Sequence, residues 1–172
     1  MNKVSLKGVR VLEFGGFWVG PYTTEILAFL GAEVIKVESM KRLDHSRELS
    51  LTTGQRFTGT DESTVFNDLN LNKLDISLDL TQPKAVELAK RIARISDVLM
   101  QNNRPGVMER LGIGYEAIRE VKPDIIYLSS SARGLNGPER GYGGFAPSFS
   151  SLSGLAEITG YVDGPPAAEA GR

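Results

Sequence analysis

Short apolar runs, separated by a glycine-rich turn and a helical pattern, follow one another at the start of the chain. Residues 9–14 are mostly apolar and end at two glycines, which is typical of a buried strand. Pro21 suits the first position of a helix because it has no N–H to leave unpaired, and apolar positions continue through residues 22–30 until Gly31. Residues 33–38 form a second β-rich run. The pattern predicts a strand, a glycine loop, a helix and a second strand parallel to the first.

The alternation of strand and helix patterns continues to about residue 130. Thr81 is placed to cap a helix that has Pro83 in its first turn and apolar residues at helical spacing. The elements predicted after residue 74 are a strand at 75–80, a helix at 81–96, a strand at 98–100, two short helices through 108–111 and 115–121, and a strand at 124–129. We expect an α/β fold with a Rossmann-like, doubly wound and mostly parallel sheet.

Two segments depart from this pattern. Residues 39–66 are polar and have no sustained period, which predicts a functional loop rather than a passive connector. Beyond Ser130 the chain is rich in Gly, Ser, Pro and Ala, with one short helix predicted near residues 149–156. We expect a Rossmann-like part at residues 1–130 and a glycine-rich segment at residues 131–172. Because the chain ends on nothing that would pack on the sheet, we interpret it as the N-terminal part of a longer two-domain protein.

Composition narrows the classes of ligand. The chain of 172 residues has 20 Lys and Arg against 21 Asp and Glu, so it has no basic face for nucleic acid or a membrane surface. It contains no Cys and one histidine, His45, which excludes thiolate and multi-histidine metal sites within it. The first apolar run is too short for a signal peptide or a membrane span. We expect a cytoplasmic protein with a small polar ligand, no metal, and His45 at the surface.

The glycine loop at residues 15–20 is the first candidate for ligand binding. Exposed backbone N–H groups and the positive end of the following helix suit a phosphate, although the loop matches neither G-x-G-x-x-G nor a P-loop, and a plain tight turn fits equally well. Phe17 and Trp18 would either cover a flat ring or belong to the core. Glu38 stands where a dinucleotide-binding fold places its ribose acid, but a surface strand end is the favoured interpretation.

Cations and amides form a second candidate, because they follow the expected carboxyl ends of the strands, where open α/β sheets bind ligands. Solvated loop charge is the alternative for each of them. The residues are Arg42, Arg47, Lys73, Asn102, Asn103, Arg104, Arg110 and Arg133. The run of residues 102–106 is the strongest of the group, because it directly follows a buried strand.

Several ordered motifs then resemble one family. They are LKGVRVLEF at 6–14, GPYTT at 20–24, LGAEVIKVE at 30–38, NK at 72–73 with LDL at 78–80, NNRPG at 102–106, RLG at 110–112 and GYVDGPP at 160–166. Together they are similar to the family III CoA-transferases, a group that includes formyl-CoA and carnitine CoA-transferases and alpha-methylacyl-CoA racemase. The resemblance implies a Rossmann-like domain that binds CoA, a smaller domain encoded further along, and an interlocked homodimer.

The resemblance also implies a CoA site and a reaction. It places CoA contacts on Gly16, Phe17, Trp18, Leu71, Asn72, Lys73, Asn102, Asn103, Arg104 and Arg110. Acyl-CoA and a carboxylic acid would be the substrates, with no permanently bound cofactor. Many members have an Arg where this chain has Ser39, which leaves Lys41, Arg42 or Arg47 to meet the 3′-phosphate.

The nucleophile of the family is an aspartate shortly after the Gly-Pro-Pro turn, which attacks the thioester and yields a mixed anhydride and then an enzyme-CoA thioester. The chain has no Asp after Pro166, so we expect the nucleophile just beyond Arg172 and this segment alone to be inactive. Glu169 is a poor substitute, since it precedes the matching position. The racemase branch uses a His and an Asp that residues 141–153 lack, which favours CoA transfer.

Two other functions stay open at this point. A nicotinamide dinucleotide-binding domain agrees with the first strand-helix-strand unit and with Glu38, but it lacks the glycine fingerprint. A non-catalytic CoA-binding subunit would follow if the natural protein ended at Arg172. The identities of the acyl donor and of the acceptor acid are not encoded in this segment.

Overall fold

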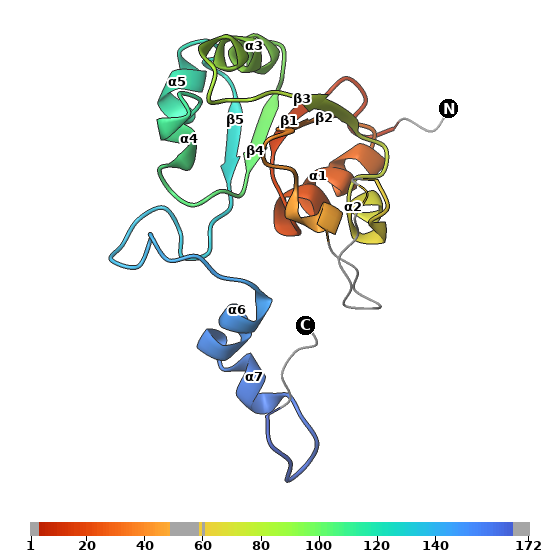
Figure 1. The fold of residues 1–172 in the computed structure, drawn as a ribbon, viewed down its shortest axis with the longest axis vertical. Coiled ribbons are helices and arrows are strands. Elements are labelled where there is room, and N and C mark those ends of the chain that lie inside the picture. Colours follow the sequence, from red (N-terminus) through yellow and green to blue (C-terminus); the bar gives the residue numbers. More distant parts are fainter. Residues whose placement is uncertain (1–3, 49–58, 60, 167–172) are drawn as a thin grey trace. The chain divides into compact units, whose positions relative to one another are not determined.

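The computed structural model describes residues 4–48, 59 and 61–166. The chain divides into two compact units, Met1–Ser130 and Ser131–Arg172, which are described separately below. The first unit is built on a five-stranded sheet with the strand order β3-β2-β1-β4-β5 (Figure 1). All neighbouring strands are parallel, as in the Rossmann-like sheet expected from the sequence. The strands are β1 (Arg10–Phe14), β2 (Glu33–Glu38), β3 (Leu74–Ser77), β4 (Val98–Gln101) and β5 (Ile126–Ser129).

Helices cover both faces of this sheet (Figure 1). Those of the first unit are α1 (Val19–Phe29), the 3-10 helix η1 (His45–Glu48), α2 (Thr64–Asp68), α3 (Pro83–Arg94), α4 (Val107–Arg110) and α5 (Tyr115–Arg119). Because side chains alternate along a strand, β1 serves both layers of the core. Leu12 and Phe14 pack with Ala89 of α3 and Ile118 of α5. On the other face, Val11 packs with residues of α1 and β2.

The boundaries of several elements differ from those expected. The first helix begins at Val19 rather than Pro21, and Trp18 takes the N-cap position. Thr81 does not cap α3, since its own N–H and hydroxyl bond Asp79 Oδ1 and the N-cap is Gln82. The strand expected to reach residue 80 ends at Ser77, because β2, its partner in the sheet, ends at Glu38.

The polar segment after β2 contains more regular structure than its composition indicates. It includes η1, and α2 begins where the Ser63 hydroxyl accepts the N–H of Phe66. Ser63 is fully buried and its hydroxyl also donates to the carbonyl of Ser46, so α2 is tied to η1. The expectation of an irregular loop through residue 66 is therefore wrong at its end; residues 49–58 and 60 lie outside the described part.

The second unit contains α6 (Ala146–Ser153) and α7 (Leu155–Ile158). A single helix near residues 149–156 was expected, but Gly154 has a φ of 78° and interrupts it. Glycine adopts this left-handed conformation without steric cost and commonly ends helices. The side chains after α7 are highly exposed, and those of Tyr161 and Val162 are more than nine-tenths accessible.

Candidate functional site at the carboxyl end of the sheet

The loops that follow β1 and β4 meet where the strand order of the sheet reverses. The Asn102 side chain, directly after β4, accepts the N–H of Gly16 at 2.9 Å and donates to its carbonyl at 2.8 Å. Asn103 donates to the carbonyl of Phe14 at 3.1 Å. Parallel sheets bind their ligands in the crevice at such a reversal point. The structure thus brings two of the sequence-predicted segments together at the place where this fold offers a site.

The peptide groups of the glycine loop are already bonded to side chains of the protein. Lys36 donates to the carbonyl of Gly15 at 2.8 Å, Asn102 holds Gly16, and Asp44 Oδ1 accepts the N–H of Phe17 at 2.8 Å. The sequence left two interpretations of this loop open, N–H groups that meet a phosphate and a plain tight turn. The N–H groups of Gly16 and Phe17 bond Asn102 and Asp44, so the phosphate interpretation is wrong for these two donors, while contact of Gly16, Phe17 and Trp18 with CoA stays a prediction.

The rings of the loop are more accessible than its backbone. Phe17 has a φ of 64°, a left-handed conformation that is uncommon outside glycine. Its ring packs edge-on against Trp18, with 5.5 Å between centroids, and lies 6.4 Å from the ring of His45. Trp18 is 38% exposed, and His45 is exposed as expected. The two loop aromatics therefore offer a partly exposed apolar surface directly after β1 rather than belonging wholly to the core.

A buried cluster of charges lies beneath the loop, on the α1 face of the sheet. Lys36 Nζ lies 3.1 Å from Glu13 Oε1 and 2.9 Å from Asp44 Oδ2, and all three side chains are at most 1% exposed. Glu13 Oε2 also accepts the hydroxyl of Thr24 and the ammonium of Lys73. We call Glu13, Lys36, Asp44 and Lys73 the buried charge cluster; its two cations balance its two carboxylates.

The protonation of this cluster follows from burial and pairing. Burial would lower the pKa of Lys36, but the carboxylates of Glu13 and Asp44 outweigh it and raise the pKa above its ordinary value. Burial likewise opposes ionisation of Asp44, yet Lys36 and the N–H groups of Ser46 and Phe17 hold its pKa below the usual range. Both groups are therefore charged at neutral pH.

Lys73 and its neighbours face α1 rather than the crevice. The Lys73 ammonium contacts Glu13, the carbonyls of Pro21 and Leu69, and Asn70 Oδ1, and its side chain is 2% exposed. Burial lowers the pKa of Lys73, although Glu13 opposes this. Asn72 donates to the carbonyl of Ala28. These contacts indicate a structural role for Lys73 and Asn72. The predicted direct contact of these two residues with CoA stays a prediction. The third predicted residue of this segment, Leu71, has an exposed side chain.

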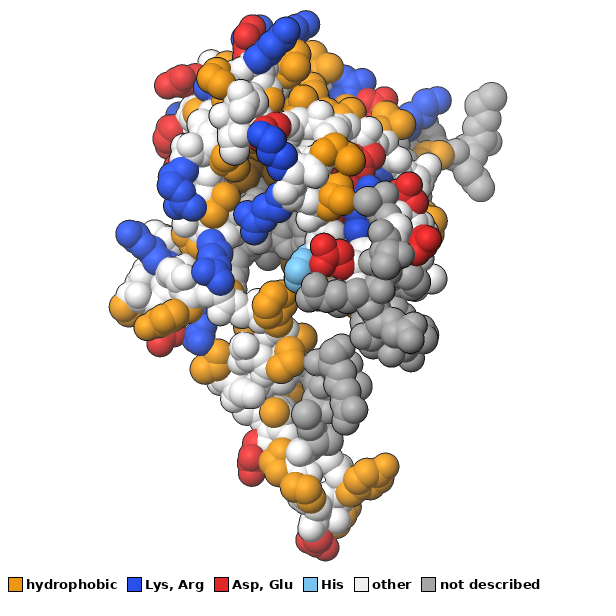
Figure 2. Space-filling view, in the orientation of Figure 1, with side chains coloured by type: hydrophobic (Ala, Val, Ile, Leu, Met, Phe, Trp, Pro, Cys, Tyr) orange, Lys and Arg blue, Asp and Glu red, His pale blue; other side chains and the backbone are white. Residues whose placement is uncertain are grey.

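Arg104 and Arg110 are exposed cations that follow β4 at this end of the sheet. Both are exposed, and neither forms an ion pair with a residue that the structure describes. Gly106, with a φ of 83°, turns the chain from Arg104 into α4, and Arg110 closes that helix. Figure 2 shows several Lys and Arg side chains on the visible face of the first unit.

Glu38 is neither a free ribose acid nor a solvated strand end. Its carboxylate binds the Arg47 guanidinium through two nitrogens and accepts the N–H of Asp44. Arg47 also lies over the ring of Phe66, 3.4 Å from its centroid. Both interpretations of Glu38 from the sequence are therefore corrected: the carboxylate is 8% exposed and already paired. Arg47 is 12% exposed in this arrangement, so Lys41 and Arg42 are the more accessible cations near Ser39.

Two residues that bond the loop directly, Lys36 and Asp44, were not among the candidates that the sequence suggested. Lys36 occupies a core position between the apolar residues Ile35 and Val37, and a Lys within a buried strand signals a paired charge. Asp44 carried no such signal, because its partners lie at Phe17 and Lys36 and only folding brings them together.

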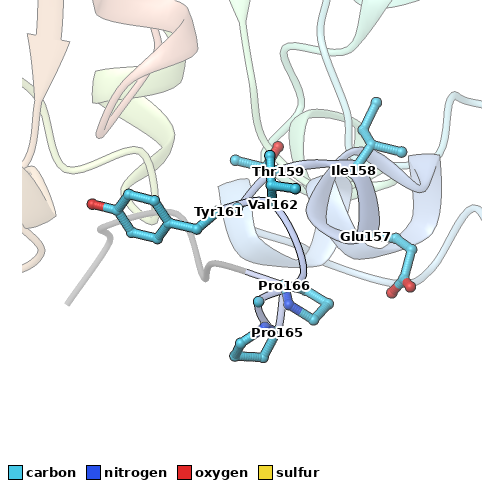
Figure 3. A pocket seen from close by; sticks show the side chains of 9 residues that line it. Glu157, Ile158, Thr159, Tyr161, Val162, Pro165 and Pro166 are labelled. Atoms are coloured by element: carbon cyan, nitrogen blue, oxygen red, sulfur yellow. The ribbon is translucent and has the colours of Figure 1, made fainter.

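The second unit contributes a shallow pocket of about 220 Å³. Its lining comes from one continuous stretch of chain, Glu157, Ile158, Thr159, Gly160, Tyr161, Val162, Gly164, Pro165 and Pro166 (Figure 3). The Tyr161 side chain extends away from Pro165 and Pro166. Glu157 is the only ionisable group of the lining apart from the Tyr161 phenol, so the pocket holds no acid-base pair. Glu169 lies outside the described residues.

Other kinds of site are absent from the described residues. Within residues 4–48, 59 and 61–166, no group of three or more His, Asp or Glu side chains is arranged to hold a metal ion. No helix in the same part of the chain is long and apolar enough to cross a bilayer.

Comparison with known proteins assigns the chain. Residues 6–171 match the profile described as CoA-transferase family III. The chain belongs to this family. Over 167 residues it is 40% identical to the human succinyl-CoA:glutarate CoA-transferase, and over 161 residues 37% identical to the succinyl-CoA–D-citramalate CoA-transferase of Chloroflexus aurantiacus. These alignments cover 96% and 94% of the chain.

Solved structures of similar proteins share the fold. The protein Rv3272 of Mycobacterium tuberculosis superposes with a TM-score of 0.80 at 32% identity, over 95% of this chain. A CAIB/BAIF family protein from Brucella suis gives 0.83 at 28% identity, over 94% of the chain. The chain spans 37% of the human relative and 42% of each of these two structures.

Proposed function

We propose that the full-length protein transfers CoA from an acyl-CoA to a carboxylic acid, and that the first unit binds the CoA moiety. The family match over residues 6–171 carries this proposal. The carboxyl end of the sheet supports it, because the exposed cations Arg104 and Arg110 follow β4, and the aromatic rings of Phe17 and Trp18 follow the neighbouring strand β1. CoA presents phosphates and a flat adenine, which charged hydrogen bonds and ring contacts recognise.

The reaction would use an aspartate beyond Arg172. Its carboxylate oxygen attacks the thioester carbonyl and the CoA thiolate leaves, which forms a mixed anhydride. The thiolate then attacks the aspartyl carbonyl, releases the first carboxylic acid and leaves an enzyme-CoA thioester. The acceptor carboxylate then attacks the enzyme-CoA thioester and displaces the CoA thiolate, which forms a second mixed anhydride. The thiolate attacks the acceptor's carbonyl in this anhydride, which releases the new CoA ester and the free aspartate. Preorganised donors must stabilise the oxyanion at each attack, and we place them in a glycine loop later in the chain.

A short dicarboxylic acid is the substrate class that the relatives favour. Relatives 40% and 37% identical are named for succinyl-CoA with glutarate or D-citramalate. We therefore expect the full-length protein to use succinyl-CoA with dicarboxylic acceptors faster than with monocarboxylic acids of equal chain length. Equal rates for matched mono- and dicarboxylic acids, measured by CoA-ester product, would remove this assignment while leaving CoA transfer intact.

Trapping tests the mechanism. Incubation of the full-length protein with an acyl-CoA and hydroxylamine should modify one Asp just beyond residue 172, and its replacement by Ala should abolish transfer. Asp124→Ala is the control, because Asp124 is an exposed residue paired with Lys122. Undiminished transfer after loss of the trapped Asp contradicts the mechanism.

The alternatives make different predictions. Glu38 is already bound to Arg47, which argues against a nicotinamide dinucleotide whose ribose would need it. NADH should therefore leave the melting temperature unchanged, whereas CoA should raise it. A non-catalytic subunit would bind CoA but transfer nothing.

Assembly and compartment also belong to this proposal. An interlocked homodimer is supported by the apolar side chains that the chain leaves exposed, among them Ile126 of β5 and Ile158 of α7. Localisation of the protein in the cytoplasm stays a prediction from the sequence.

A further inference from the structure

The glycine loop is held in an unfavourable conformation by the protein itself. Phe17 has a φ of 64°, and a bulky residue in this region is strained. Such a conformation persists only where surrounding groups determine it. Here each of three successive residues has a peptide group bonded by a side chain from another element: Gly15 by Lys36, Gly16 by Asn102 and Phe17 by Asp44.

Two of these three side chains are buried charges. Lys36 and Asp44 lie 2.9 Å apart with side chains 1% exposed, and Lys36 also reaches Glu13. Removing ions from water is costly, and apolar residues of similar size often stabilise a protein as well or better. Hydrogen bonds from such a pair to a loop, however, fix its backbone in a way that apolar contacts do not. The stability of the fold alone therefore does not account for Lys36 and Asp44.

We propose that Lys36 and Asp44 are positioning residues for CoA, which set the loop of residues 15–18 before the ligand arrives and so direct Phe17 and Trp18 toward the crevice. This inference rests on the proposed CoA site. Asp44 provides the decisive contact, because its Oδ1 accepts the N–H of the strained residue while its Oδ2 holds Lys36. Ser46 supports this carboxylate with its own N–H and hydroxyl.

A pair of double variants in the full-length protein separates the loop contact from the charge. Lys36→Met with Asp44→Asn and Lys36→Met with Asp44→Ala both remove one positive and one negative charge. Only the first keeps a side-chain oxygen at residue 44 to accept the N–H of Phe17. We expect CoA to bind the Ala variant about tenfold more weakly than the Asn variant, measured by calorimetry, because binding must then also order the loop.

A control accounts for general loss of stability. Ile118→Val removes a methylene from the core on the other face of the sheet, where Ile118 makes none of the loop hydrogen bonds, and should leave CoA affinity unchanged. A KM that rises in the Ala variant, with a kcat close to that of the Asn variant, is the expected kinetic signature. Equal CoA affinities of the two double variants overturn the proposal. Failure of the unaltered protein to bind CoA instead contradicts the proposed function.

Hydrogen exchange of the unaltered protein provides a test that needs no variant. The amides of Gly16 and Phe17 should be protected from exchange before CoA is added, and CoA should change their protection little. Amides that exchange freely without CoA and become protected only on binding would show that the ligand, rather than Lys36 and Asp44, orders the loop.

Discussion

At the scale of single residues, polar side chains near the crevice fall into two groups that the sequence does not distinguish. Lys73, Asn102 and Arg104 all belong to family motifs and all follow strands or turns. Lys73 is buried against carbonyl oxygens and Asn102 clamps Gly16, whereas Arg104 is exposed. A ligand at this surface can therefore contact the side chain of Arg104, whereas that of Lys73 is not accessible to it.

Arg104→Ala in the full-length protein should weaken CoA binding by roughly ten- to a hundredfold, because a charged hydrogen bond to phosphate contributes about 1.5–3 kcal/mol. Arg133→Ala is the matched control and should cost much less, since Arg133 pairs with Glu139 at 2.8 Å. Calorimetry with CoA and with dephospho-CoA measures both variants. Equal, small losses would mean that the motif at 102–106 is only a structural turn.

Asp75 should make stability depend on pH. Burial and a hydrogen bond with Glu38 raise its pKa from 3.8 to about 7. Between about pH 4 and 7 the folded protein then holds a proton that the unfolded chain releases, so this residue makes stability fall as pH rises through that window. The Asp75→Asn variant should lose less stability between pH 4 and 7, and above pH 7 its melting temperature should exceed that of the unaltered protein.

Thermal unfolding from pH 4 to 8 measures this effect. The control is Asp61→Asn, which also removes a carboxylate near Arg47, 3.0 Å from it, but one whose side chain is 89% exposed. It should leave the decline between pH 4 and 7 in place. Parallel curves for the unaltered protein and Asp75→Asn would show that Asp75 is ionised throughout.

At the scale of elements, the glycine loop and the start of α1 approach each other closely at Gly20. A Cβ on Gly20 would lie 2.9 Å from both Gly15 Cα and Asn102 Oδ1. Because real Cβ atoms do not come this close to backbone, α1 and the loop must separate to admit it. No side chain fits at Gly20 without moving the Asn102 clamp.

Gly20→Ala should therefore lower the free energy of unfolding by about 1–3 kcal/mol and weaken CoA binding as well. Gly141→Ala is the control, because a Cβ there meets nothing within 4 Å. Urea unfolding and calorimetry measure the two effects. A Gly20→Ala protein as stable as the control would contradict the close packing of loop and helix.

The elements themselves were largely readable from local pattern, since the apolar runs at β1, β2 and β4 and the spacing in α3 depend on neighbours along the chain. Local sequence patterns did not predict the ends of an element where those ends depend on residues distant in the sequence. The start of α2 depends on Ser63, which bonds Ser46 from the preceding segment, and the end of β3 depends on β2. The pairing of Lys36 with Asp44 could not be predicted from the periodicity of the sequence, because these contacts form only when β2 lies beside the glycine loop.

At the scale of the whole molecule, the chain represents a part of the length of its relatives, 37% of the human one. The nucleophile and its oxyanion donors are proposed to lie outside it. Residues 1–172 expressed alone should therefore show no CoA transfer, while the full-length protein turns over. Product formation from succinyl-CoA and glutarate measures both; comparable rates would place the nucleophile within these residues.

The buried charge cluster also has a consequence for the approach of the proposed ligand, CoA. Lys36 and Lys73 are enclosed with carboxylates, and Arg47 is bound to Glu38, so these cations project little field into solvent. With a formal net charge of −1, the chain offers a multiply anionic ligand no long-range attraction beyond that of exposed side chains such as Arg104 and Arg110. Encounter should then be governed by diffusion and local collision rather than electrostatic steering. The association rate would consequently change little with ionic strength, whereas the lifetime of the complex, which depends on direct phosphate contacts, would shorten as salt is added.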